Sequence, residues 1–143
     1  GAAVGTTDIQ TLTNKTLTGI AAGSSVKDSA GTSYAIGYRE VPQNAQNGAY
    51  TLSLADVGKH IFSANAGAQT ITLPTNAVAA FAIGTAITIV NAGTSPISLS
   101  AAGVTLYQAG SSNTGNRTIA VRGVATLLKV GTDVWFISGA GIS

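Results

Sequence analysis

The sequence contains no cysteine, and only 8% of its 143 residues are charged. Without cysteine the chain has neither disulfides nor thiolate ligands for a metal, so packing and association must stabilise it. Its seven Lys and Arg residues are scattered singly, and no apolar run reaches the roughly twenty residues of a membrane helix. We therefore expect no nucleic-acid partner and no membrane insertion.

Val, Ile and Thr recur in short segments that alternate with turn residues, which is typical of strands. The pattern predicts an all-β fold, a β-sandwich or jelly-roll-like domain preceded by an extended N-terminal arm. The expected strands are residues 35–41, 49–54, 60–64, 69–73, 86–90, 97–101, 104–107, 117–120, 124–130 and 135–138.

The chain divides by composition into an N-terminal segment, residues 1–33, and a globular part, residues 34–143. Residues 1–33 are mostly Gly, Ala, Ser and Thr, with too few large apolar side chains to build a core. We interpret them as an extended arm that is ordered by partners. The first residue is Gly1 rather than Met, so we expect a start that was processed, trimmed or left out.

The octapeptide at residues 11–18, Thr-Leu-Thr-Asn-Lys-Thr-Leu-Thr, repeats a Thr-Leu-Thr unit and has no catalytic group. Its extended chain would present unpaired strand edges, which three copies together could satisfy. We predict that Leu12, Leu17 and Ile20 face a shared axis, while Asn14 and the threonine side chains face water or form a ladder along that axis. These four residues are the candidate assembly interface.

The octapeptide resembles a recurrent signature of bacteriophage tail-fibre and other virion surface proteins. From residue 37 onward, the order of segments resembles a C-terminal module of many phage structural proteins. The resemblance implies a compact β domain that forms a homotrimer on the virion surface, with capsid or tail proteins as further partners. The matching segments are residues 37–44, 50–61, 70–74, 81–91, 124–130 and 134–139.

Functional groups for catalysis are scarce, and we predict no enzyme activity, no cofactor and no metal site. His60 is the only histidine, and Ser53 with Asp56 would be its partners in a nucleophilic triad. Asp56 has a sufficient role in capping a turn, and a lone His makes no metal site within one chain. The carboxylates that a glycosidase would need are limited to Asp8, Asp28, Glu40, Asp56 and Asp133.

A polar loop supplies the candidate contact surface for a host-surface glycan. It follows an aromatic residue and offers small hydrogen-bonding side chains and one guanidinium. Its candidate contact residues are Tyr107, Gln108, Asn113, Asn116 and Arg117. We expect Trp135 and Phe136, in contrast, to pack in the core.

Three functional classes remain open from the sequence. The octapeptide favours a fibre or spike that presents loops to a host receptor. The short length, if the chain is complete, favours a capsid decoration protein that stabilises the head. A carbohydrate-binding module shares the β architecture and the polar loops, but it gives no reason for the octapeptide.

Overall fold

The computed structural model describes residues 25–27, 33–35 and 40–143. The chain separates into two units, residues 1–37 and 38–143. In the first unit, β1 (Ser25–Lys27) and β2 (Ser33–Ala35) form an antiparallel pair.

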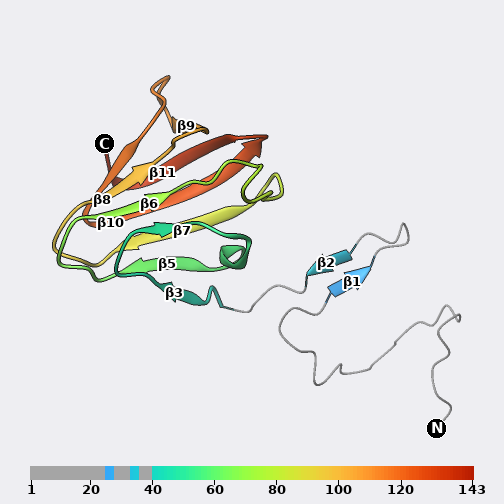
Figure 1. Cartoon of the computed structure of the whole chain (residues 1–143), viewed down its shortest axis with the longest axis horizontal. Coiled ribbons are helices and arrows are strands. Elements are labelled where there is room, and N and C mark those ends of the chain that lie inside the picture. The colour runs from blue at the N-terminus through green and yellow to red at the C-terminus, as the bar shows by residue number, and fades with distance from the viewer. Residues whose placement is uncertain (1–24, 28–32, 36–39) are drawn as a thin grey trace, which may run out of the picture. The chain divides into compact units, whose positions relative to one another are not determined.

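The second unit is built almost entirely of strands, so the all-β prediction is confirmed (Figure 1). A single 3₁₀ turn, η1 (Leu54–Asp56), interrupts the early strands. The strands are β3 (Gln43–Ala45), β4 (Tyr50–Thr51), β5 (His60–Ser63), β6 (Gln69–Thr72), β7 (Ala86–Asn91), β8 (Ile97–Ser100), β9 (Thr105–Gln108), β10 (Arg117–Gly131) and β11 (Val134–Ile142).

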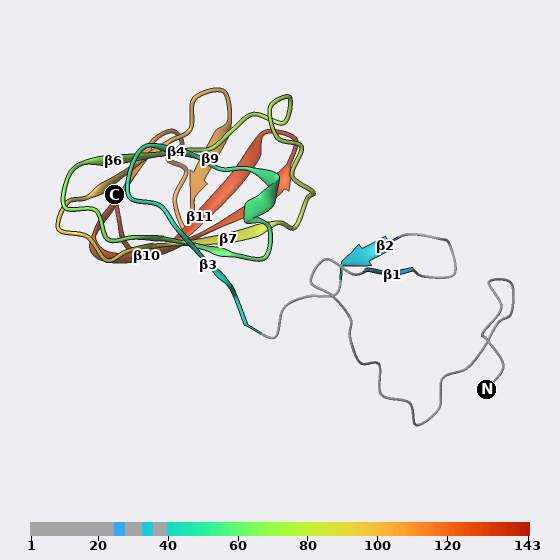
Figure 2. The same cartoon turned by 60° about the horizontal axis from the view of Figure 1, so that its bottom comes forward.

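The chain passes back and forth between two parallel stacks of strands, as in a short coil. One stack is β3-β5-β7 and the other is β4-β6-β8, with parallel pairing inside each stack. Alternating residues of both stacks point inward, so Ile61 lies beside Ile89 in one stack and Ile71 beside Leu99 in the other. The result is a mixed sheet that curls into a half-barrel (Figure 2).

Strand β10 joins the two stacks. Residues 117–119 pair antiparallel with β8, and residues 124–128 pair antiparallel with β7. Between these ladders, Arg122 has a φ of 65°, and a Cβ at Gly123 would lie 2.8 Å from the carbonyl oxygen of Ala120. This bend carries one strand from the β4-β6-β8 stack to the β3-β5-β7 stack, as β-bulges do at sheet corners. The sequence predicted two strands here, and the structure has one continuous strand.

Beyond β10 the sheet continues through β11 and β9. Strand β11 is antiparallel to β10, and β9 is parallel to β11.

The apolar side chains that face inward from all these strands form a single core. Its largest fully buried members are Leu52, Ile61, Ile71, Leu73, Ile87, Ile89, Ile97, Leu99, Leu106, Ile119, Leu127 and Trp135.

Successive corners of the coil stack closely on one another. A Cβ at Gly93 would lie 2.1 Å from the backbone oxygen of Asn65, so only glycine fits at this position. The buried Asn91 amide donates to the carbonyl oxygens of Ile119 and Ala120 at 3.1 and 3.0 Å. This side chain therefore ties the last corner to the bend in β10.

A buried carboxylate organises the opposite end of the coil, next to β3 and β4. The Asp56 carboxylate accepts hydrogen bonds from Asn44 Nδ2 at 2.6 Å, from Tyr50 Oη at 2.9 Å and from the backbone N–H of Ser53 at 2.7 Å. Asp56 is completely buried. A buried charge is costly unless it is hydrogen-bonded. These hydrogen bonds therefore allow the Asp56 carboxylate to be buried at this end of the core.

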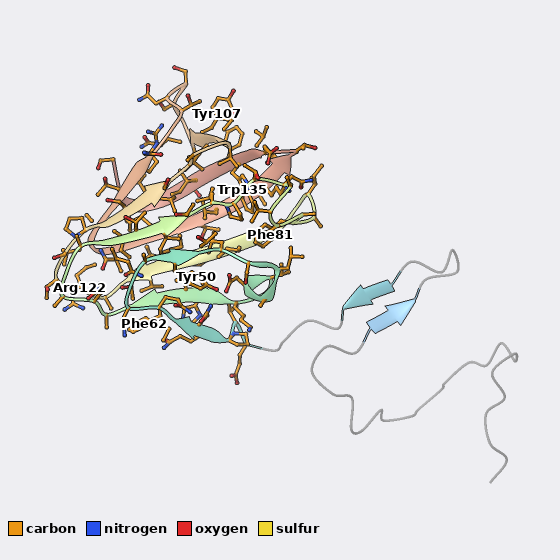
Figure 3. The ribbon with its side chains drawn as sticks, viewed as in Figure 1. Tyr50, Phe62, Phe81, Tyr107, Arg122 and Trp135 are labelled. Carbon is orange, nitrogen blue, oxygen red and sulfur yellow. The ribbon has the colours of Figure 1, made fainter. Side chains whose placement is uncertain are left out.

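The prediction that Trp135 packs in the core is confirmed, since it is 1% exposed and its ring meets Phe81 edge-on at 5.5 Å (Figure 3). The same prediction for Phe136 is wrong, because the side chain is 39% exposed. Neighbouring residues of a strand point to opposite faces, so Trp135 and Phe136 cannot both point inward.

Candidate assembly surface

The outer face of the sheet formed by β7, β10, β11 and β9 exposes a row of apolar side chains. Ala86 is in register with Leu128, Leu128 with Phe136, and Phe136 with Tyr107. Because residues in register share a face, the row crosses all four strands. Leu128 is 41% exposed, although it is a large hydrophobic residue in the middle of the sheet.

Tyr107 and Phe136 stack at the β9 end of this row. Their ring centroids are 5.1 Å apart, and the ring planes are inclined by 26°. Parallel pairing of β9 with β11 brings the two rings together, although they are distant in the sequence. The stacked pair gives the face a rigid aromatic rim.

A shallow hollow of about 560 Å³ lies on this face. It has no charged side chain in its lining, which consists of Ala86, Ala109, Thr126, Leu128, Val130, Phe136 and Ser138. We refer to these residues together with Tyr107 as the apolar face. Lys129 lies between Leu128 and Val130 in the sequence. Its side chain points to the opposite side of the strand, into the core.

The apolar face has the composition of a protein contact surface. The buried centres of protein interfaces are depleted in charge and enriched in aromatic residues. Contiguous exposed apolar surface on a folded domain generally marks such a contact. The arrangement offers shape and hydrophobicity to a partner.

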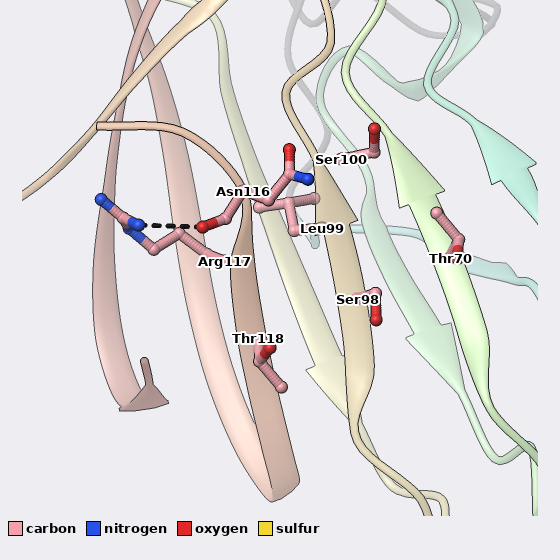
Figure 4. Close-up of a pocket in the computed structure, with 7 residues that line it drawn as sticks. All are labelled: Thr70, Ser98, Leu99, Ser100, Asn116, Arg117 and Thr118. Carbon is pink, nitrogen blue, oxygen red and sulfur yellow. Dashed lines mark hydrogen bonds between the residues drawn. The ribbon is translucent and has the colours of Figure 1, made fainter. Parts of the chain in front are cut away.

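The outer face of the other stack is polar. Thr70 is in register with Ser98, and Ser98 with Thr118, so three hydroxyl groups form a row across β6, β8 and β10 (Figure 4). A hollow of about 310 Å³ lies here and is lined by Thr70, Ser98, Leu99, Ser100, Asn116, Arg117 and Thr118. We call these residues the polar groove.

Two residues of the polar groove lie where the preceding loop meets β10: Asn116 ends the loop and Arg117 begins the strand. Asn116 Oδ1 accepts a hydrogen bond from the backbone N–H of Ala101 at 2.9 Å, which fixes its side chain. Arg117 Nη1 donates to the Asn116 carbonyl oxygen at 2.8 Å (Figure 4). Among the described residues, Nε and Nη2 of Arg117 have no hydrogen-bond partner and are shielded from solvent.

The predicted contact loop does not form a single surface. Tyr107 belongs to the apolar face, Asn116 and Arg117 line the polar groove, and Asn113 is exposed near the tip of the loop. Gln108 ends β9, where its backbone N–H donates to the Asn113 carbonyl oxygen. The predicted interface residues Leu12, Asn14, Leu17 and Ile20 lie outside the described residues.

The three residues considered for a nucleophilic triad are only partly brought together. Ser53 and Asp56 are in contact, because the Ser53 backbone N–H donates to the carboxylate. His60 Nδ1 instead lies 3.0 Å from the carbonyl oxygen of Val41. In the described part of the chain, no three His, Cys, Asp or Glu residues are grouped so as to hold a metal ion.

The sequence analysis missed the exposed members of the apolar face. In residues 124–130, apolar residues occur at both alternating phases of the strand, and Trp135, Phe136 and Ile137 are consecutive. A strand that is apolar on both sides has a second face to bury. That doubled pattern was the available signal for Leu128, Val130 and Phe136.

No protein-family model matches this chain, and no curated protein matches it. The described residues include no helix that is long and apolar enough to cross a membrane.

Proposed function

We propose that this chain is a structural component of a bacteriophage virion, a trimeric fibre- or spike-type surface protein without enzymatic activity. It would attach through residues 1–33 and expose the β domain on the particle. The observation that carries the proposal is the octapeptide at residues 11–18, followed by a β-rich domain in the order that the resemblance implies.

The apolar face supports the self-association that this function requires. Because the hollow and its rim contain no formal charge, copies of the face can meet without bringing like charges together. Three such faces around a common axis would each be covered by their neighbours, which is how closed homo-oligomers hide apolar surface. The polar groove would then remain on the outside.

The solution mass of the full chain, measured by light scattering, tests the trimer. We expect three chain masses for the full protein, and a smaller or less stable assembly when residues 1–33 are deleted. A monomer at all concentrations would contradict the proposal. As a control, Glu40→Gln changes an exposed charge remote from the apolar face and should leave the mass unchanged.

Binding to separated phage tails and empty heads distinguishes a fibre from a capsid decoration protein. The fibre proposal predicts that the chain cosediments with tails and that deleting residues 1–33 abolishes this. Cosedimentation with empty heads, together with increased resistance of those heads to heat, would favour the decoration alternative instead.

The polar groove favours a second role, contact with a host-surface saccharide. Hydroxyl groups of Thr70, Ser98 and Thr118 are arranged in register, and the Arg117 guanidinium lines the same hollow. Hydroxyl and guanidinium groups are the hydrogen-bonding groups that sugars engage. Titration of the protein with host polysaccharide, followed by NMR, should shift the amide signals of β6 and β8. Shifts confined to β9 and β11 would contradict this assignment.

A further inference from the structure

Lys129 occupies a position that the strand pattern reserves for an apolar residue. Along β10 the buried positions alternate through Ala125, Leu127 and Lys129, and Lys129 is only 3% exposed. Its Nζ donates at 2.7 Å to two neutral oxygens, Asn76 Oδ1 and the carbonyl oxygen of Phe81. Lysine is almost never buried to this extent without a carboxylate partner, so the site requires another explanation.

The backbone around the amine is fixed on both sides. The Lys129 N–H donates to the Thr85 carbonyl oxygen at 2.9 Å, and the Lys129 carbonyl oxygen accepts from Gly84 at 2.8 Å. The Asn76 backbone N–H donates to the Asp133 carboxylate. Asp133 thereby holds Asn76 in place, so amine and carboxamide are positioned by the fold.

One aromatic ring lies near the Lys129 amine, and a second ring packs against the first. Nζ of Lys129 lies 5.9 Å from the centroid of the Trp135 ring, and Phe81 packs against that ring at 5.5 Å (Figure 3). Both rings are buried, so water has little access to the amine. A dry site favours attack by an amine over competing hydrolysis, and it makes a persistent buried charge costly.

We propose that Lys129 and Asn76 form a spontaneous intramolecular isopeptide bond. A contact of 2.7 Å to Oδ1 places the amine within reach of the adjoining Cγ, as proximity-driven reactions require. Nζ attacks Cγ, the new Cγ–Nζ bond forms and the Cγ–Nδ2 bond breaks. The lysine ammonium group loses one proton before the attack and a second proton as the amide forms. Both protons leave on the departing nitrogen, so lysine ammonium and carboxamide become an amide and an ammonium ion.

The bond would supply a covalent crosslink to a chain that has no cysteine. It joins residues 53 positions apart and anchors the long loop between β6 and β7 to β10. A crosslink of this span restricts the unfolded chain much as a disulfide does, but no reductant can open it. The reaction also removes the charge from the core.

Intact-mass spectrometry of the folded, purified full chain tests the proposal. We expect a mass lower than that of the sequence by one molecule of ammonia. Trypsin should then release residues 60–117 joined to residues 123–143, because a modified Lys129 is not cleaved. The sequence mass, persisting after prolonged incubation of folded protein, would overturn the proposal.

Substitutions identify the reacting groups. Lys129→Arg should retain ammonia and give the sequence mass, whereas the matched Lys59→Arg should still lose it. Asn76→Asp should lose water in place of ammonia. Ammonia loss that persists in Lys129→Arg would indicate a succinimide, for which Asn47-Gly48 is the expected position, and would overturn the proposal.

Discussion

The two outer faces of the β domain differ sharply, although the strands beneath them share one core. The face of β7, β10 and β11 exposes Leu128, Val130 and Phe136, whereas the face of β6 and β8 exposes Thr70 and Ser98. Beneath both faces most inward positions hold Ile, Leu and other apolar residues. The inward residues thus determine the fold, and the outward residues determine whether each face is suited to contact with water or with another apolar surface.

The difference favours the proposal that a partner covers the apolar face. Apolar surface in contact with water gives no stability to a monomer, and burying it against a partner gains roughly 25 cal/mol per Å². The exposed hydroxyl groups of the polar face, in contrast, are able to hydrogen-bond to water. Changes in the shared core should therefore affect both faces, and changes on the outside should affect only one.

The largest effect is expected for Trp135→Ala, which removes the largest fully buried side chain. It should lower the free energy of unfolding by about 3–5 kcal/mol. The matched variant Phe136→Ala, at the next and outward position, should cost about 1 kcal/mol through lost stacking on Tyr107. Urea unfolding at one fixed protein concentration measures both. Equal losses in the free energy of unfolding would show that the inward and outward faces of β11 do not differ in their contribution to stability.

Asp56→Asn should have the next largest effect, because the buried carboxylate accepts from Asn44, Tyr50 and Ser53. We expect a loss of about 2–3 kcal/mol in the free energy of unfolding, since an amide cannot accept all these donors. The exposed Glu40→Gln is the control and should not shift the urea midpoint. An unchanged midpoint for Asp56→Asn would mean that the network does not hold this end of the coil.

Phe136→Glu should weaken association and leave the fold in place. Placing a carboxylate in the apolar face should raise the dissociation constant at least about tenfold, equivalent to about 1.4 kcal/mol. Sedimentation velocity over a dilution series provides the measurement, and circular dichroism verifies the strands. If Phe136→Glu associates as tightly as the unchanged chain, the apolar face is not part of the assembly interface.

The smallest effect is expected for Ser98→Val, on the polar face. A substitution at an exposed strand position typically changes stability by less than about 0.5 kcal/mol. Neither the urea midpoint nor the sedimentation profile should move. A loss of association in Ser98→Val would show that the polar face, and not the apolar face, is the contact surface.

Strand alternation predicted much of the fold. The segments that became β5, β6, β7 and β8 were located within one or two residues, because each has inward Ile or Leu and ends at turn residues. Alternation within one strand does not reveal which strand lies beside it, so the parallel stacks were not predictable. Because of the bend at Arg122 and Gly123, the sequence pattern predicted two strands where the structure has one.

The candidate site was harder to predict than the fold. Tyr107 was chosen as a sugar contact because it precedes a polar loop, but only the pairing of β9 with β11 reveals its stack on Phe136. Lys129 is buried because it shares the inward phase of β10 with Ala125 and Leu127, a choice between two apolar phases that the sequence leaves open. Its partner Asn76 comes from a distant loop, which local patterns cannot locate.

Thiol labelling tests most directly whether the apolar face is the covered one. Because the chain has no cysteine, Leu128→Cys and Ser98→Cys each introduce a single thiol, both at exposed positions of the isolated chain. In the assembled protein we predict that Leu128→Cys reacts with a soluble thiol reagent at least about tenfold more slowly than Ser98→Cys, with the difference lost on dilution. Equal labelling rates in the assembled protein would contradict the account.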